Sequence, residues 1–241
     1  MKHWKGLAAA LLVPLALAAC LFVPGKFTSV MTIHADRSFS YSYKGEVLAV
    51  DMAGMMSKAM GGLATAFANT SETDSATSNE SAAMPEDTPE QKAENDKKYR
   101  DIAAKLAKEA GYSVVEYRGD GKFYVEYAIS GVLSHNFVFP YNQDTGLIFP
   151  FVAVELRGKD QVRVKAPGFA KQSDADSGGM PSAEEASASL DGTFTLITDA
   201  EIVSQNQEEG AKTSGTSKTV TWRVTPISED APMAVLRVKG I

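Results

Sequence analysis

Residues Lys26–Asp51 read KFTSVMTIHADRSFSYSYKGEVLAVD and contain two β-forming runs joined by a short polar turn. The first run, Val30–His34, is apolar and β-branched, and Asp36 begins residues that suit a turn. In the second run aromatic residues alternate with serines, which puts three rings on one face of a strand. Such a stripe usually forms half of a core and only sometimes a ligand wall. The aromatic residues are Phe39, Tyr41 and Tyr43.

Further strands are predicted downstream. YSVVEY and KFYVEYAIS flank Arg118–Gly121, where Asp120 and Gly121 give a hairpin signal. Six later stretches have strand composition: HNFVF, GLIFPFVAVEL, QVRVK, GTFTLIT, KTVTWRVT and MAVLRVKG. The sequence therefore predicts an α+β fold, a mostly antiparallel sheet with one or two packed helices.

Two segments predict those helices. Residues 52–68, MAGMMSKAMGGLATAFA, have apolar side chains at helical spacing and one charge. This segment either packs on the core or, because methionine is flexible and polarizable, offers an adaptable surface to lipid tails. The second helix is expected to start at a Thr88 cap, with Pro89 in its first turn and Gln91 in the capping-box position, and to end at Gly111. Its apolar stripe predicts that it lies on a sheet.

The N-terminus has the layout of a secretory signal peptide. Met1–Lys5 is basic, and Gly6–Ala19 is a run of fourteen uncharged residues, too short for a stable membrane-spanning helix. Cys20, the only cysteine, follows Leu17 and the small residues Ala18 and Ala19 in a lipobox pattern. We expect residues 1–19 to be removed and acyl chains such as palmitate to anchor Cys20, at about 0.8 kcal/mol per buried methylene. The alternative is an ordinary signal peptide with a cysteine near its cleavage site.

The charge of the chain is acidic. Its 24 basic and 30 acidic residues give a net charge of −6, and loss of Lys2 and Lys5 with the signal peptide makes it −8. A protein of this charge lacks the basic footprint of nucleic-acid binding, so no nucleic acid is expected as a partner. Two acidic, serine-rich tracts, 69–87 and 171–192, are predicted to be flexible loops within a single lipid-anchored domain of residues 20–241.

No constellation of catalytic residues is found in the sequence. Only His34 and His135 remain after processing, and they form neither a His-Glu-x-x-His motif nor a close pair, so no metal site is expected. The nucleophile elbow, the phosphate-binding loop and the dinucleotide-binding glycine pattern are all missing. The sequence therefore predicts a non-enzymatic protein without a cofactor.

Three features in order along the chain carry a family resemblance. They are the lipobox, GKFTSVMTIHADRSFSYSYKGEV at 25–47, and TFTLITDAEIVSQNQEEGAKTSGTSKTVTWRVTP at 193–226. Together they resemble the LppM-type domain of bacterial envelope lipoproteins. The resemblance implies a cell-envelope lipoprotein with a lipid- or glycolipid-binding fold. Because Leu21 follows Cys20, the periplasmic face of the outer membrane is the expected location in a cell with two membranes.

Two functions of different classes follow as hypotheses. The first is a binding module for a lipid or glycolipid, enclosed by the sheet and the methionine-rich segment. Its candidate lining residues are Tyr41, Tyr43, Met55, Met56, Met60 and Phe67. The second is a structural or interaction lipoprotein that docks an envelope protein through a sheet edge or a helix face.

Overall fold

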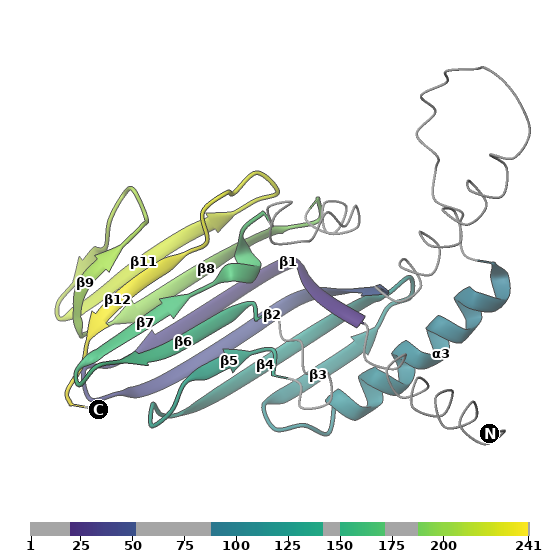
Figure 1. Ribbon diagram of the computed structural model, residues 1–241, viewed down its shortest axis with the longest axis horizontal. Helices are drawn as coiled ribbons and strands as arrows, with labels where there is room; N and C mark the ends of the chain where they lie inside the picture. Colours follow the sequence, from purple (N-terminus) through teal and green to yellow (C-terminus); the bar gives the residue numbers. More distant parts are fainter. Residues whose placement is uncertain (1–19, 52–87, 142–149, 172–187, 241) are drawn as a thin grey trace, which may run out of the picture.

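The computed structural model describes residues 20–51, 88–141, 150–171 and 188–240 (Figure 1). The first half contains β1 (Cys20–Ile33), β2 (Ser38–Asp51), the helix α3 (Pro89–Leu106), β3 (Tyr112–Tyr117), β4 (Lys122–Val132) and β5 (Phe137–Phe139). The second half contains β6 (Val152–Arg157), β7 (Gln161–Lys165), the short helix η3 (Pro167–Phe169), β8 (Asp191–Thr198), β9 (Glu201–Gln205), β10 (Lys212–Ser214), β11 (Ser217–Val224) and β12 (Met233–Arg237).

The strands form two sheets. Sheet A has seven strands in the order β10-β11-β8-β1-β2-β4-β3, and sheet B has five in the order β5-β6-β7-β12-β9. Neighbouring strands are antiparallel throughout except that β1 and β8 are parallel. One hydrophobic cluster includes residues of both sheets, so the sheets form a sandwich. The helix α3 packs beside β3, far from β9 in Figure 1. The predicted α+β class is confirmed.

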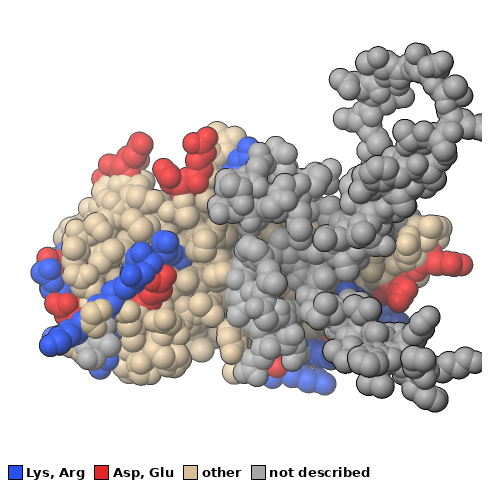
Figure 2. All heavy atoms as spheres, in the orientation of Figure 1, with Lys and Arg blue, Asp and Glu red and all other residues tan. Residues whose placement is uncertain are grey.

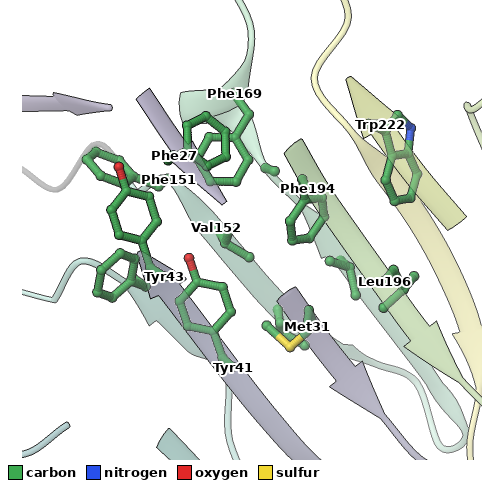
Figure 3. Packing of buried hydrophobic residues seen from close by; sticks show 14 of the residues in the cluster. Phe27, Met31, Tyr41, Tyr43, Phe151, Val152, Phe169, Phe194, Leu196 and Trp222 are labelled. Atoms are coloured by element: carbon green, nitrogen blue, oxygen red, sulfur yellow. The ribbon is translucent and has the colours of Figure 1, made fainter. Parts of the chain in front are cut away.

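The aromatic face of β2 is part of this core, as the alternation predicts. Tyr41 and Tyr43 are each 1% exposed, and both rings contact Phe139 of β5 with centroids 5.1 and 5.3 Å away. On the neighbouring strand, Phe27 stacks between Tyr43 and Phe169, and the Phe27–Phe169 centroids are 4.1 Å apart (Figure 3). Rings from both sheets and from η3 therefore interlock, which fixes the distance between the sheets.

The predicted start of α3 is confirmed and its predicted end is wrong. Thr88 caps the helix, and the reciprocal capping-box bonds with Gln91 are present. The helix ends at Leu106, not at Gly111, because tighter i to i+3 bonds replace the helical pattern from Lys108 onward. Gly111 instead has φ +94° and lies against the Tyr127 ring, so it serves the turn into β3.

The predicted hairpin is confirmed, and the predicted end of the second acidic tract is wrong. The predicted hairpin is the β3–β4 turn, where Asp120 and Gly121 both have positive φ. The second acidic tract was expected to extend to residue 192, but β8 begins at Asp191. Asp191 and Gly192 pair with Lys26 and Phe27 of β1, so sheet pairing overrides their polar composition. Residues 69–87, 172–187 and the methionine-rich segment lie outside the described residues.

The ring of Phe27 leaves no space for a side chain at residue 192. A substitution of Gly192 therefore tests the packing. A Cβ at Gly192 would overlap that ring, and Phe27 cannot swing away because Tyr43 and Phe169 stack on it. Replacing Gly192 by alanine should therefore lower the free energy of unfolding by about 1–3 kcal/mol, measured by urea denaturation. Gly131→Ala is the matched control in β4, where the nearest atom would lie at 3.5 Å. Equal urea midpoints for the two variants would contradict this account.

Candidate binding surfaces

The two predicted tyrosines lie within the packed core. The Ser29 hydroxyl donates to the Tyr41 oxygen at 3.1 Å, and the Tyr43 hydroxyl donates to the Glu46 carbonyl at 2.7 Å. Burial raises the pKa of both tyrosine hydroxyls well above the usual value. Both groups thus stay neutral with their polar atoms engaged inside the protein. A ligand would reach these rings only if Phe139 and its neighbours moved apart.

Of the other predicted binding residues, Cys20 is described by the structure and those of the methionine-rich segment are not. Cys20 is the first residue of β1, and its backbone pairs with Asp51, the last residue of β2. The methionine-rich segment follows Asp51 directly in the sequence. The candidate residues of that segment lie outside the described residues: Met55, Met56, Met60 and Phe67.

Each of the two described histidines has a hydrogen-bond partner. His34 Nδ1 lies 3.1 Å from Asp199 Oδ2, and His135 Nδ1 lies 3.1 Å from the Ser134 hydroxyl. Within the described ranges, no three metal-ligating side chains gather in a way that could hold an ion. In the same part of the chain, no helix has the length and apolar character needed to cross a membrane.

An open groove of about 670 Å³ runs along β9. Every residue of β9 lines the groove, together with Lys218 of β11 and Ala211 of the loop before β10. The groove therefore lies between the free edge of sheet B and the β10–β11 side of sheet A. Its lining residues are Asp199, Glu201, Ile202, Val203, Ser204, Gln205, Ala211 and Lys218.

Asn206 fixes one end of β9 relative to both sheets. Its side-chain oxygen accepts from the Trp222 indole N–H at 3.0 Å and from the Met233 backbone N–H at 2.9 Å, and its amide donates to the Ala231 carbonyl at 2.8 Å. Trp222 belongs to sheet A and Met233 to sheet B, so one side chain holds the two sheets together.

The turn at Asp199 fixes the other end. Asp199 Oδ1 accepts from the Ala35 backbone N–H at 2.7 Å, and Lys218 Nζ donates to the Ala200 carbonyl at 3.0 Å. The bond from Ala35 is the main reason that the pKa of Asp199 lies below 3.8, with His34 adding to the effect. These contacts tie the β1–β2 turn to the chain as it passes from sheet A to sheet B, so the groove is preformed.

Both sheets carry ion pairs, among them Lys44–Glu126 at 2.7 Å on sheet A, but sheet A also has an uncharged part. Sheet B carries ion pairs such as Arg163–Glu155 at 2.7 Å and Arg237–Glu201 at 2.8 Å. Basic and acidic side chains are interspersed on the face that Figure 2 presents. On sheet A, two adjacent cross-strand rows contain hydroxyl and apolar side chains and no charge. Those rows are Thr221, Thr195, Val30, Ser42 and Ala128, and Thr219, Ile197, Thr32, Ser40 and Ser130.

Sequence reasoning did not find the groove. It depends on β9 and β11 both lining it, and no residue type in EIVSQ signals that arrangement. The one local signal is Val203, an apolar residue in a polar stretch that is 42% exposed. Exposed apolar residues are common singly, so the residue alone would not mark a site.

The comparisons with known proteins leave the family open. No model of a protein family matches the chain, and no curated protein matches it. Among solved structures, the NMR structure of the folded domain of Mycobacterium tuberculosis LppM is similar at 16% identity, covering 91% of this chain and 94% of that one, with a TM-score of 0.32. A likeness of this degree does not assign the chain to a family, so the resemblance stays a prediction.

Removing the Asn206 side chain should loosen the sandwich. Asn206→Ala leaves the Trp222 and Met233 N–H groups without their acceptor, which should cost about 1–3 kcal/mol in the free energy of unfolding. Asn206→Asp keeps an acceptor oxygen but cannot donate to the Ala231 carbonyl, so it should recover only part of that loss. Urea denaturation followed by circular dichroism measures both, and an unchanged midpoint for Asn206→Ala would show that the side chain does not hold the sheets together.

Asp199 should contribute stability that disappears in acid. Its pKa is lower in the folded state, so its ionised form stabilises the fold above pH 3.8, and this contribution declines as the pH falls through the lowered pKa. The difference in unfolding free energy between the wild type and Asp199→Asn should therefore shrink below about pH 4. Urea titrations of both proteins from neutral pH downward measure it; a difference independent of pH would refute the assignment.

Proposed function

We propose that this chain is a membrane-anchored envelope lipoprotein that acts as a non-catalytic binding module for a lipid or glycolipid. The main support is the pairing of Cys20 with Asp51. Acyl chains on Cys20 would hold this end of the β1–β2 hairpin at the membrane. The methionine-rich segment starts at the residue after Asp51, and its composition suits contact with irregular apolar chains.

A second candidate function is supported by the groove along β9. The 14 residues of β1 span about 40 Å, and Ala35, just past its far end, bonds the Asp199 turn where the groove begins. A module anchored through Cys20 would thus present the groove away from the membrane. This geometry favours docking of an envelope protein at β9, and it is compatible with lipid binding at the other end.

The anchor has a direct test. Replacing Cys20 by alanine removes the only thiol, so the full chain expressed in a bacterial envelope should move from the membrane fraction to the soluble fraction. Cell fractionation and mass measurement of the N-terminal peptide report the location and the acyl chains. Ala18→Ser, a small-residue change that leaves Cys20 in place, is the control. A Cys20→Ala protein that stays in the membrane fraction would refute the anchor.

The ligand class is tested by native mass spectrometry with extraction of non-covalently bound lipid from the purified full chain. A stoichiometric, defined lipid supports the proposal, and replacing Met56 and Met60 by lysine should strongly reduce its occupancy because charge is costly in an apolar site. Met233→Lys on β12 is the control. Absence of any lipid from the wild-type chain would contradict lipid binding and leave the docking function.

A further inference from the structure

β9 is the least protected edge strand of the described sandwich. Sheet A ends at β3, against which α3 packs, and at β10, which has three residues. Sheet B ends at β5, which also has three residues, and at β9, which has five. Proteins commonly blunt their sheet edges by covering or shortening them. Apart from β3, which α3 covers, β9 is the longest of these edges, and the groove borders it.

The outer edge of β9 has no neighbouring strand in the described sheet. Asn206 N–H donates to the Met233 carbonyl at 3.2 Å, so Asn206 faces β12. Successive residues of an antiparallel strand turn their N–H and C=O groups to opposite edges, so Gln205 turns its backbone groups toward the groove. A register shift in the β9–β12 pair leaves Val203 without a partner residue on β12, and its side chain is exposed beside these groups.

Residues beyond β9 also line the groove. Ala211 and Lys218 border it together with the whole of β9, so an extended chain that lies along β9 would also contact the β10–β11 side of the molecule. The volume of about 670 Å³ falls within the usual range for binding pockets, about 300–1,000 Å³. Because Asn206 and Asp199 fix both ends, little ordering of the site is needed on binding.

The charged side chains that line the groove have hydrogen-bond or ion-pair partners within the protein, and Lys218 Nζ donates to the Ala200 carbonyl at 3.0 Å. Glu201 pairs with Arg237 at 2.8 Å, and Asp199 accepts from Ala35 and lies beside His34. Since these carboxylates have partners, the groove favours an occupant with uncharged side chains that uses its backbone for recognition.

From these observations we propose that β9 binds an extended, proline-free peptide segment of a partner protein with uncharged side chains, which adds as a sixth strand to sheet B. The proposal deepens the docking function and does not depend on lipid binding. Backbone hydrogen bonds to the free edge supply affinity, and the contact with Val203 supplies specificity.

Phage-displayed random peptides of about eight residues, panned against the detergent-purified full chain, supply the probe. A selected peptide should slow hydrogen exchange of the β9 amides, and N-methylation of its alternate amides should abolish binding because strand addition requires them. Val203→Arg should weaken binding by about tenfold or more, measured by fluorescence anisotropy. Val132→Arg is the matched control, since Val132 is also an exposed strand valine and lies on β4.

Three outcomes would overturn the proposal. The first is selection of no peptide that distinguishes the wild type from Val203→Arg; the second is equal binding of the N-methylated peptide, which would mean recognition by side chains alone. The third is dimerisation of the wild type that Val203→Arg abolishes, which would make a second copy the occupant.

Hydrogen exchange and N-methylation use the wild-type protein, so these two tests remain valid even where Val203→Arg fails to fold. Loss of membrane anchoring in Cys20→Ala leaves all these readouts unchanged.

Discussion

The parallel pairing of β1 with β8 determines how the rest of the molecule is arranged. Parallel strands need a long connection, and here β2–β7 lie between the two in the sequence. Three strands of that connection, β5–β7, form most of sheet B and cover the aromatic face of sheet A. Because β8 runs alongside β1 and ends at Thr198 beside Ile33, the chain can turn at Asp199 and pass into sheet B as β9.

The same pairing explains where the ring of Phe27 lies in the core. Phe27 pairs with Gly192, and its ring occupies the space that a side chain at residue 192 would fill. The ring then bridges Tyr43 of β2 and Phe169 of η3, so it joins sheet A to the segment that follows β7. A glycine in a strand normally weakens it, and here an aromatic neighbour compensates for the missing side chain.

Local signals were sufficient to predict the start of α3, the β3–β4 hairpin and the buried face of β2, but not the end of α3 or the strands β9 and β10. The aromatic alternation around Tyr41, the hairpin at Asp120 and the cap at Thr88 all depend on residues close in sequence, and the structure confirms each. The division into two sheets and the groove depend on pairings between residues about 165 apart, such as Ile33 with Thr198, which composition does not encode. Tyr41 and Tyr43 were predicted both as core and as ligand wall; the described structure has them in the core.

The extended shape of the β1–β2 hairpin separates two possible tasks along one axis. Cys20 and Asp51 lie at one end of the hairpin, and the Ala35–Asp199 bond lies at the other. β1 is paired on both sides, by β2 and β8, over Lys26–Ile33, while its Cys20 end is paired by β2 alone. The two ends of the hairpin are kept apart because both strands are extended over 14 residues. A lipid contact near Cys20 and a strand-binding edge at β9 would therefore not compete for space. Under the proposed anchoring, a partner could bind at β9 while the other end of the domain contacts the membrane.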